Sequence, residues 1–497
     1  MIQSCKEELL PKQQVREINN PRGEQIALRL AKANTADRME EKKHDNKTAH
    51  QQAKPSVKRE EAGWGWRMAV NLCRLPLSLA LIFSGFVKAI DPLGTQYKIG
   101  DYLEALHLEQ YAPSWATLTT SVLLSAVEFC LGVFLLFAIR RRKASRVIVA
   151  FMAIMTAITV WLWGWEPIKD CGCFGDAIHL TNGETLLKNL LLLAMAAVVA
   201  WKPFCMVRFI SKTNQWIVIN YTLLFILVSS ALSLWYLPPF DFRPYHIGAD
   251  IRKGMEIPAG AKQPKFETTF ILEKGGVRKE FTLDNYPDST WTFIDSKTVE
   301  VEKGYEPPIH DFSITDPATD DDLTEQVLAD KGYTFVLVAP YLELADATNF
   351  GEIDRIYEYA QDHHYGFIAL TASEDKAVAH WRDITGAEYP FYITDGTTLK
   401  TVIRSNPGLL LLRHGVVINK WSHNGLPTAE ELAKPLEKSA LGKTPPDEVS
   451  QRVTLIVLCF VLPLFVLTLA DRTWQWTKWI RRRRKQNNMP SEAEQES

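Results

Sequence analysis

Cysteine is scarce in this chain, and its distribution limits the chemistry. The 497 residues contain seven cysteines, too few for a scaffold held together by disulfides. Five of them lie in a polar tail, inside apolar runs or directly after one, and we interpret them as small apolar side chains. These five are Cys5, Cys73, Cys130, Cys205 and Cys459. Only Cys171 and Cys173 lie in a polar connection, so this pair is the candidate for dithiol chemistry.

Aromatic residues are scarce in residues 1–62, which are rich in Lys, Glu, Gln and Ala. This composition predicts a disordered tail, because it cannot bury enough apolar surface to offset chain entropy. We expect no secretory signal peptide, since no apolar core of the required length follows the first charges. The net charge of −2 gives no indication of nucleic-acid binding. The basic clusters lie beside apolar runs, where they indicate membrane topology.

Six apolar runs of about 20 residues predict transmembrane helices. They cover residues 68–90, 117–139, 147–165, 185–201, 216–236 and 453–470. With their flanks they give a four-helix membrane domain (66–202), a fifth helix (214–237), a sixth helix (451–472) and a basic cytoplasmic tail (473–497). The fold class is therefore a membrane α-helical bundle joined to a polar region between the fifth and sixth helices.

The positions of Lys and Arg predict the orientation. The connections after the second and fourth runs and the tail after the sixth are basic, whereas those after the first and third contain only Lys98 and Lys169. The positive-inside rule then places both termini in the cytoplasm of a bacterial inner membrane. The dithiol loop and residues 240–450 share the outer compartment, where disulfides form and persist.

Two parts make up the polar region. Alternating apolar and polar residues predict a small antiparallel β module over 262–306. Over 307–440, strands alternate with helices, which is typical of an α/β sandwich. The last predicted element of this domain is a helix that begins at Ala429.

The α/β domain resembles thioredoxin in its order of elements and in Asn406-Pro407 directly before the strand 409–412. The resemblance implies a cis proline at Pro407 and a partner-binding surface around Asn406 and Pro407; an ordinary trans turn proline is the alternative. Where that family has a Cys-X-X-Cys pair, this chain has residues 339–343, Ala-Pro-Tyr-Leu-Glu. The family's own disulfide exchange therefore does not carry over.

Residues 66–200 resemble the DoxX and MauE group of small membrane proteins. The matching features are Arg74, Phe83-Ser84-Gly85-Phe86-Val87-Lys88, Asp91-Pro92, Glu128, Gly132, the string Asp170-Cys171-Gly172-Cys173-Phe174-Gly175, and Leu187-Lys188-Asn189. MauE-like proteins are linked to disulfide formation in envelope enzymes, usually beside a thioredoxin-like partner. DoxX-like proteins are associated with quinone-coupled oxidation, so a quinone is the cofactor that this resemblance implies.

The Cys171-Gly172-Cys173 motif closes a very small ring as a disulfide, which favours easy reduction and transfer to a partner. Its supporting residues are Gly172, Phe174, Gly175 and Asp176. Asp170 and Asp176 bracket the pair and only Lys169 opposes them, so the charges near in sequence disfavour a thiolate, although a helix N-terminus near Thr181 would favour one. A structural disulfide, a metal site and idle thiols are the alternatives. We predict no metal, because a closed zinc site needs four ligands and only His179 is near in sequence, with His107 and His246 on the same predicted side.

Glu128 lies near the middle of the second run, where an ionisable group is a functional hypothesis. We expect Arg74 to be its partner, because Lys88 lies within about 3 Å of the outer end of its own run. The alternatives for Glu128 are a structural ion pair and a proton relay or quinone contact. Trp161, Trp163 and Trp165 are interpreted as an interfacial belt, with a quinone pocket as the alternative.

Two functions of different classes follow from the sequence. The first is a thiol-redox protein of the inner membrane, or its accessory, in which Cys171 and Cys173 cycle and the α/β domain binds an envelope client near Pro407. The second is a non-enzymatic assembly factor with a structural disulfide. Membrane lipid and an envelope thiol or disulfide protein are the expected partners, without nucleic acid. Transport is disfavoured because the apolar runs contain few polar groups.

Overall fold

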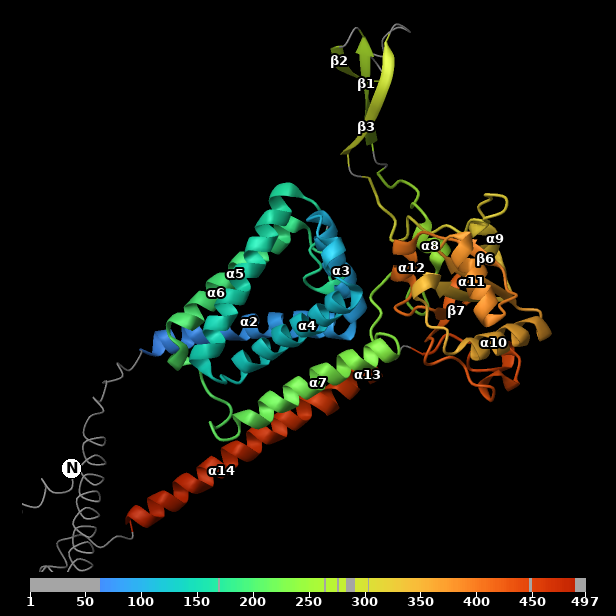
Figure 1. Cartoon of the computed structure of the whole chain (residues 1–497). Helices are drawn as coiled ribbons and strands as arrows, with labels where there is room; N and C mark the ends of the chain where they lie inside the picture. The colour runs from blue at the N-terminus through green and yellow to red at the C-terminus, as the bar shows by residue number, and fades with distance from the viewer. Residues whose placement is uncertain are drawn as a thin grey trace, which may run out of the picture. The chain divides into compact units, whose positions relative to one another are not determined.

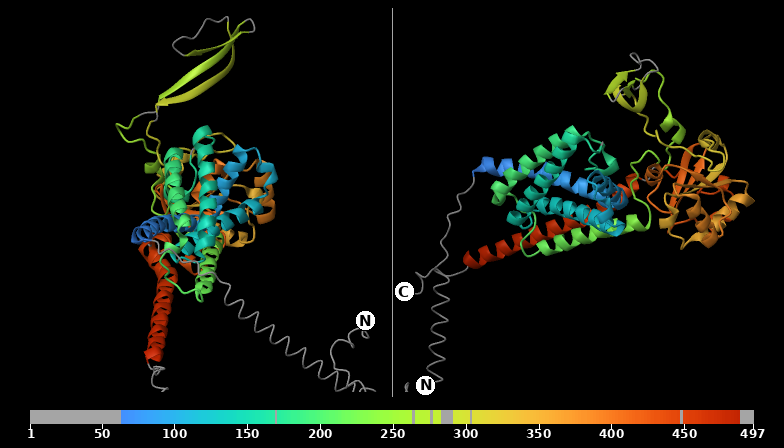
Figure 2. Two further views of the ribbon diagram at one scale, coloured as in Figure 1. Left: turned by 90° about the vertical axis from the view of Figure 1, so that its left-hand side faces the viewer. Right: turned by 45° about the horizontal axis from the view of Figure 1, so that its top comes forward.

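The computed structural model describes residues 63–487, except residues 169, 263–264, 275–276, 283–290, 303 and 447–448. The predicted disorder of 1–62, the last ten residues of the basic tail and Lys169 lie outside the described residues. Figures 1 and 2 show the chain from three directions.

Six helices among the described residues are long and apolar enough to cross a membrane. They are α2 (Trp64–Ile90), α4 (Ser114–Leu136), α5 (Arg141–Trp165), α6 (Asn182–Trp201), α7 (Gln215–Trp235) and the C-terminal run of α13 (Val449–Ile456), η8 (Val457–Val461) and α14 (Leu462–Asn487). Each predicted run overlaps one of these helices. The last helix continues well past the predicted end at residue 470, because Arg, Lys and Gln are good helix formers outside a membrane too.

Helices α2 and α4 run antiparallel and touch through two glycines. A Cβ on Gly85 would lie 2.4 Å from the amide nitrogen of Phe129, and one on Gly132 would lie 2.7 Å from that of Ile82. Small residues allow this close approach of two membrane helices. The contact fixes how far the two helices overlap. Ile90, the last residue of α2, lies level with a position about ten residues into α4, which is about 15 Å along the helix axis from the start of α4.

Helix α3 (Pro92–Ala105) fills the space that α2 leaves beside α4. Asp91 caps it: the Asp91 carboxylate accepts from the Gly94 amide, and Pro92 occupies the first helical turn, where its missing N–H is no cost. Helix α3 therefore begins directly at the end of α2. Ser121 on α4 donates to the Pro92 carbonyl at 2.7 Å and ties the two elements together.

The C-terminal helix packs against α7, as Figures 1 and 2 show. Phe225 of α7 stacks on Phe460, with ring centroids 4.4 Å apart. Pro463 has no amide hydrogen, and the single π turn η8 precedes it. The Tyr221 hydroxyl donates to the Cys459 carbonyl four residues before this proline. The Cys459 carbonyl cannot accept a hydrogen bond from Pro463 four residues on, and it accepts one from Tyr221 of α7 instead.

The predicted β module is a three-stranded antiparallel sheet in the order β2-β1-β3. Its strands are β1 (Lys265–Lys274), β2 (Val277–Thr282) and β3 (Thr292–Glu302). Strand β1 pairs with both others, so it is the central strand.

The α/β domain contains a five-stranded mixed sheet in the order β6-β5-β4-β7-β8. The strands are β4 (Tyr333–Ala339), β5 (Gly366–Thr371), β6 (Phe391–Ile393), β7 (Gly408–Arg413) and β8 (Val416–Ser422). Strands β4, β5 and β6 are parallel, and β7 is antiparallel to both β4 and β8. The helices around the sheet are α8 (Ile251–Met255), α9 (Thr324–Ala329), α10 (Phe350–Asp362), α11 (Asp375–Thr385) and α12 (Gly396–Val402).

Every residue of β4 is buried, because apolar layers cover both faces of the sheet. Phe335 belongs to the layer that includes Trp381 of α11, and Val336 belongs to the layer that includes Leu399 of α12. This burial explains the continuous apolar sequence of the strand. The helix predicted from Ala429 is wrong. The structure has two short 3₁₀ turns there, η6 (Glu431–Ala433) and η7 (Leu436–Lys438), because Pro435 interrupts a helix between them.

Candidate functional site

The two loop cysteines lie together between α5 and α6. Their Sγ atoms are 2.9 Å apart as free thiols, and both residues are buried. Gly172 between them has a φ of +64°, a left-handed conformation that favours glycine. A Cβ at Gly172 would also approach Lys98 Cγ to 3.1 Å. The glycine therefore allows the turn that brings the two sulfurs into contact.

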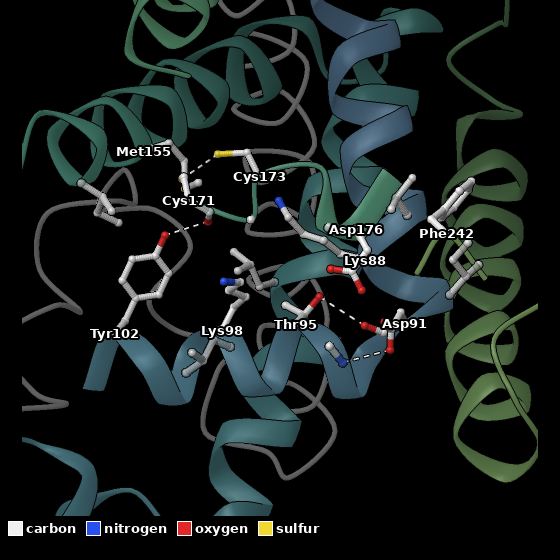
Figure 3. A pocket seen from close by; sticks show the side chains of 18 of the residues that line it. Lys88, Asp91, Thr95, Lys98, Tyr102, Met155, Cys171, Cys173, Asp176 and Phe242 are labelled. Carbon is white, nitrogen blue, oxygen red and sulfur yellow. Dashed lines mark hydrogen bonds between the residues drawn. The ribbon is translucent and has the colours of Figure 1, made fainter. Parts of the chain in front are cut away.

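Two hydroxyl groups hold the backbone of this loop. Tyr102 of α3 donates to the Cys171 carbonyl at 2.7 Å, and Ser84 of α2 donates to the Cys173 carbonyl at 2.6 Å. The Phe174 ring packs against Phe83, with centroids 5.5 Å apart. Figure 3 shows the contact of Tyr102 with the cysteine loop. Two helices, α2 and α3, therefore fix the dithiol loop, although both lie about 70 to 90 residues before it in the sequence.

Lys88, and not Arg74, is the partner of Glu128. Lys88 Nζ lies 2.7 Å from Glu128 Oε2, and the two side chains are only 5% and 6% exposed. The prediction of Arg74 was wrong because it assumed that α2 and α4 end at the same level. Because the end of α2 lies level with a position about ten residues into α4 and does not reach the level of its first residue, the last turn of α2 faces the middle of α4. Arg74 instead donates to the Val207 carbonyl at 2.7 Å and stacks on Phe209.

The environment favours a thiolate on one of the two sulfurs. The hydrogen bond from the Cys171 thiol is the largest influence and lowers the pKa of Cys173 to about 6; burial opposes it, and the Lys188 and Lys88 ammonium groups reinforce it. The same hydrogen bond, together with burial, raises the pKa of Cys171. The expectation that nearby charges disfavour a thiolate was therefore wrong. It counted Asp170, Asp176 and Lys169, but the effective cations come from α2 and α6.

Lys188 was quoted only as part of a motif, and its role was missed. Its ammonium lies 4.1 Å from the centroid of the Phe174 ring, directly beside the dithiol loop. A single lysine within the apolar run of α6 was a usable signal, because ionisable residues at membrane depth are functional hypotheses by default. Thr181 caps this helix through a capping box with Glu184, which confirms the predicted helix start.

An apolar pocket of about 590 Å³ opens beside both cysteines. Its walls come from the end of α2, from α3 and α5, and from the segment after α7. Ile158 and Trp161 are among its apolar lining, and Lys98 is among its few charged residues. Figure 3 shows side chains that line it. Cys171 and Cys173 are thus buried from bulk water but accessible from this pocket.

An arginine of the α/β domain reaches the rim of the pocket. Arg404 Nε lies 3.0 Å from Asp91 Oδ2, and Arg404 Nη2 lies 3.0 Å from Asp176 Oδ2. The guanidinium also stacks on Tyr97 of α3, and only 6% of its side chain is exposed. Burial lowers the pKa of Arg404, but the negative charges of the two aspartates outweigh this effect, so the pKa of Arg404 is raised. Asp176 therefore binds this arginine, a contact that sequence spacing did not indicate.

The peptide bond between Asn406 and Pro407 is cis, as predicted. Asn406 donates to the Tyr341 carbonyl at 2.8 Å, in the segment that follows β4. The Ser405 hydroxyl donates to the Pro407 carbonyl at 2.6 Å and also contacts His423 Nδ1 at 2.9 Å. These bonds fix the turn three residues after Arg404.

The predicted histidines do not converge on the dithiol. His179 lies 3.4 Å from Asp170 and is largely exposed. His246 contacts the Arg243 carbonyl, away from the cysteines. In the part of the chain that the structure describes, no group of three or more His, Cys, Asp or Glu side chains is arranged to hold a metal ion.

Comparison with known protein families supports the interpretation of residues 66–202 as a membrane domain. Residues 66–202 match the family model of the methylamine utilisation protein MauE. Residues 266–303 match a model described as a domain of unknown function, DUF8463. No curated protein matches the chain.

Among solved structures, the chain is similar to the solution structure of a candidate protein disulfide isomerase from Bacteroides thetaiotaomicron. That match has 13% identity and covers 29% of this chain and 83% of the other. Its TM-score of 0.19 is too low to support an argument. The match to the MauE model shows that the membrane region, residues 66–202, is MauE-like. The fold of the α/β domain is described by its sheet topology and not by this structural match.

Proposed function

We propose that this chain is a thiol-redox protein of the cell envelope, or the accessory of one, in which Cys171 and Cys173 exchange a disulfide with a protein client. The observation that carries the proposal is the pair of sulfurs 2.9 Å apart, on a loop fixed by α2 and α3 and open to a pocket. Two cations of the membrane helices favour a thiolate there. The MauE-like region supports the same class of function.

The two sulfurs have different roles in the exchange. A client thiolate attacks Cys171 Sγ of the Cys171–Cys173 disulfide, the bond between the two sulfurs breaks, and Cys173 leaves as a thiolate. Cys173 is the better leaving group because its pKa is the lower of the two. A second client thiolate then attacks the client sulfur bound to Cys171. The client disulfide forms, Cys171 leaves and takes a proton, and two electrons have passed from the client to the pair.

The α/β domain positions the client at this site. Its order of strands, its cis proline at Pro407 and its lack of a cysteine pair suit a thioredoxin-like binding role. The contacts of Arg404 with Asp91 and Asp176 support the proposal that this domain and the dithiol loop share one side of the membrane. The positive-inside rule makes that side the outer face of a bacterial inner membrane, with both termini cytoplasmic.

Thiol trapping in intact cells tests this function. Cells producing the full chain, Cys171→Ser or Cys173→Ser are quenched with acid and alkylated, and the redox state of the pair is read from gel mobility. We expect the wild-type pair to be partly oxidised and Cys173→Ser to accumulate a mixed disulfide on Cys171. A pair that stays reduced in an oxidising envelope, with no mixed disulfide in either variant, excludes exchange. A fully oxidised pair that never exchanges supports the assembly factor instead.

The apolar pocket favours a second candidate, a quinone-linked oxidoreductase. Its volume of about 590 Å³ and apolar walls suit a lipid-soluble ring compound, and both thiols line it. In this reaction the reduced pair gives two electrons to the quinone, one proton comes from the Cys171 thiol and one from water, and a disulfide and a quinol form. The test is the oxidation of the reduced protein in nanodiscs by a short-chain ubiquinone. Ile158→Trp should fill the pocket and stop this oxidation while leaving exchange with glutathione disulfide intact; unchanged quinone reduction excludes this use of the pocket.

A further inference from the structure

A second apolar space lies next to the dithiol pocket, among the membrane helices. It is a groove of about 520 Å³ between α7 and the C-terminal helix, which lie side by side in Figures 1 and 2. We call it the α7 groove. Its lining residues on α7 recur every three or four positions from Tyr221 to Tyr236. They therefore form one stripe along about 22 Å of the helix.

Three hydroxyl groups that line the α7 groove are bonded within the protein. Ser229 donates to the Phe225 carbonyl at 2.9 Å, and Ser233 donates to the Ser229 carbonyl at 3.0 Å. Tyr221 donates to the Cys459 carbonyl. These hydroxyl groups therefore use their hydrogens on the backbone, and the groove suits an apolar chain better than a polar group.

The α7 groove opens toward the lipid. Leu224 of α7 and Leu455 of α13 both line it, and they are 62% and 61% exposed although they belong to membrane-spanning helices. Among the described residues that line the groove, Arg452 is the one charged side chain, and it donates to the Pro239 carbonyl. An apolar chain can therefore enter this groove from the membrane.

Phe240 lies at the junction of the α7 groove and the dithiol pocket. Phe240 and Ile90 line both spaces. The Phe240 ring lies 6.5 Å from the ring of Phe86, which lines the groove. It also stacks at 6.1 Å on Phe242, which lines the dithiol pocket (Figure 3). A single aromatic side chain thus connects the wall of the groove with the wall of the pocket.

We propose that the α7 groove binds the isoprenoid tail of a membrane quinone whose ring lies in the dithiol pocket. The inference rests on the quinone reaction proposed above and adds the path by which this substrate enters from the membrane. At the rim, Arg404, Asp91 and Asp176 are charged, so this side gives an apolar tail no favourable path. In the complex the tail leaves the pocket beside Phe240 and continues along α7.

Two quinones with the same ring, one without a tail and one with several isoprene units, test the inference. The reduced full chain in nanodiscs is mixed with each quinone, and stopped-flow absorbance follows quinol formation. Ser229→Trp places a large side chain in the groove. It should slow the reaction of the tailed quinone about tenfold or more and leave that of the tailless quinone unchanged. Each variant is compared with the wild type for the same quinone, so their different partition into the membrane cancels.

Leu227→Trp is the matched control. Leu227 is 39% exposed and lies on α7 two residues before Ser229, but it does not line the groove. Both quinones should react with this variant at the wild-type rate. If Ser229→Trp slows neither quinone, or slows both equally, the tail does not occupy the groove and the inference is wrong.

A quinone with a diazirine at the end of its tail locates the tail without a rate measurement. After illumination, mass spectrometry should find the label on groove residues such as Leu224 and Val228. An excess of tailed quinone should prevent this labelling, whereas tailless quinone should not. Equal label on Leu223 and Leu227, outside the groove, would indicate general contact with lipid-facing surfaces and contradict the inference. Label confined to α5, which also borders the dithiol pocket, would contradict it too.

The wild-type protein separates a failure of the inference from a failure of the proposed reaction. A folded wild type that exchanges with glutathione disulfide but reduces neither quinone contradicts the quinone reaction, and the inference with it. A wild type that reduces both quinones, with Ser229→Trp showing no selective loss for the tailed one, contradicts the tail site alone. The two failures are therefore distinguishable.

Discussion

Replacement of Arg404 by methionine should release the α/β domain from the rim of the dithiol pocket. Arg404 makes hydrogen bonds to Asp91 and Asp176 from a site where its own side chain is 6% exposed. Removal of one partner of a buried ion pair costs about 3 to 5 kcal/mol. The aspartate side chains are 19% and 31% exposed, so water partly solvates their charges once the arginine is gone. We therefore take the lower end of this range of free-energy cost. About 3 kcal/mol corresponds to about a hundredfold loss in the docking equilibrium.

The rate of alkylation of Cys171 and Cys173 measures this release. The α/β domain contacts the rim at Asp91 and Asp176, which also line the pocket with the two thiols. A membrane-impermeant maleimide should therefore label the reduced Arg404→Met protein at least tenfold faster than the wild type.

Arg413→Met is the matched control for this experiment. Arg413 also stacks on a tyrosine, Tyr333, but its guanidinium contacts no carboxylate of the membrane region. We expect its labelling rate to equal that of the wild type. In a background of Asp91→Asn and Asp176→Asn, Arg404→Met should add little. Equal labelling of Arg404→Met and Arg413→Met would show that this contact does not control access to the thiols.

Three other predictions follow from single contacts. The alkylation rate of Cys173 should rise with pH through a midpoint near 6, because the thiolate is the reactive form and the pKa of Cys173 is lowered to about 6. Lys188→Gln removes a nearby cation and should move this midpoint to higher pH. Stopped-flow absorbance measures both rates. Gly85→Ala should lower the thermal stability in detergent by about 1 to 3 kcal/mol or more, because its Cβ has no room, whereas Gly164→Ala, with open space, should not. Lys420→Met should destabilise the α/β domain by about 3 to 5 kcal/mol in urea, because the buried ammonium holds a carboxylate and two carbonyls; an unchanged midpoint contradicts this.

Much of the fold could be predicted from local patterns. The length of each apolar run predicts a membrane helix, and the alternation of strands with helices predicts the α/β domain. The cis bond before β7 was implied only by the resemblance of the α/β domain to thioredoxin, and the structure confirms it. The membrane helices and the alternation of strands with helices depend on residues that are close in sequence, which is why pattern reasoning reaches them.

The partners of the dithiol could not be predicted in the same way. The relative level of α2 and α4 depends on the contacts of Gly85 and Gly132, and no count of residues from the end of a run reveals it. The error on Arg74 and Lys88 follows directly from that missing level. Arg404 is separated from Asp176 by more than two hundred residues, and nothing in its local sequence distinguishes it from an ordinary surface arginine.

The geometry changes the role of the α/β domain in the proposed exchange. The sequence suggested a client surface at Pro407, free to meet a partner. In the structure, Lys400 and Arg404, which precede that proline, both stack on Tyr97 of the membrane region. In the proposed exchange, a client bound at Pro407 would lie three residues along the chain from Arg404, which contacts Asp91 and Asp176 at the rim of the dithiol pocket. A domain without cysteines of its own can contribute to disulfide exchange in this way, because bringing a thiol to a fixed partner supplies much of the rate.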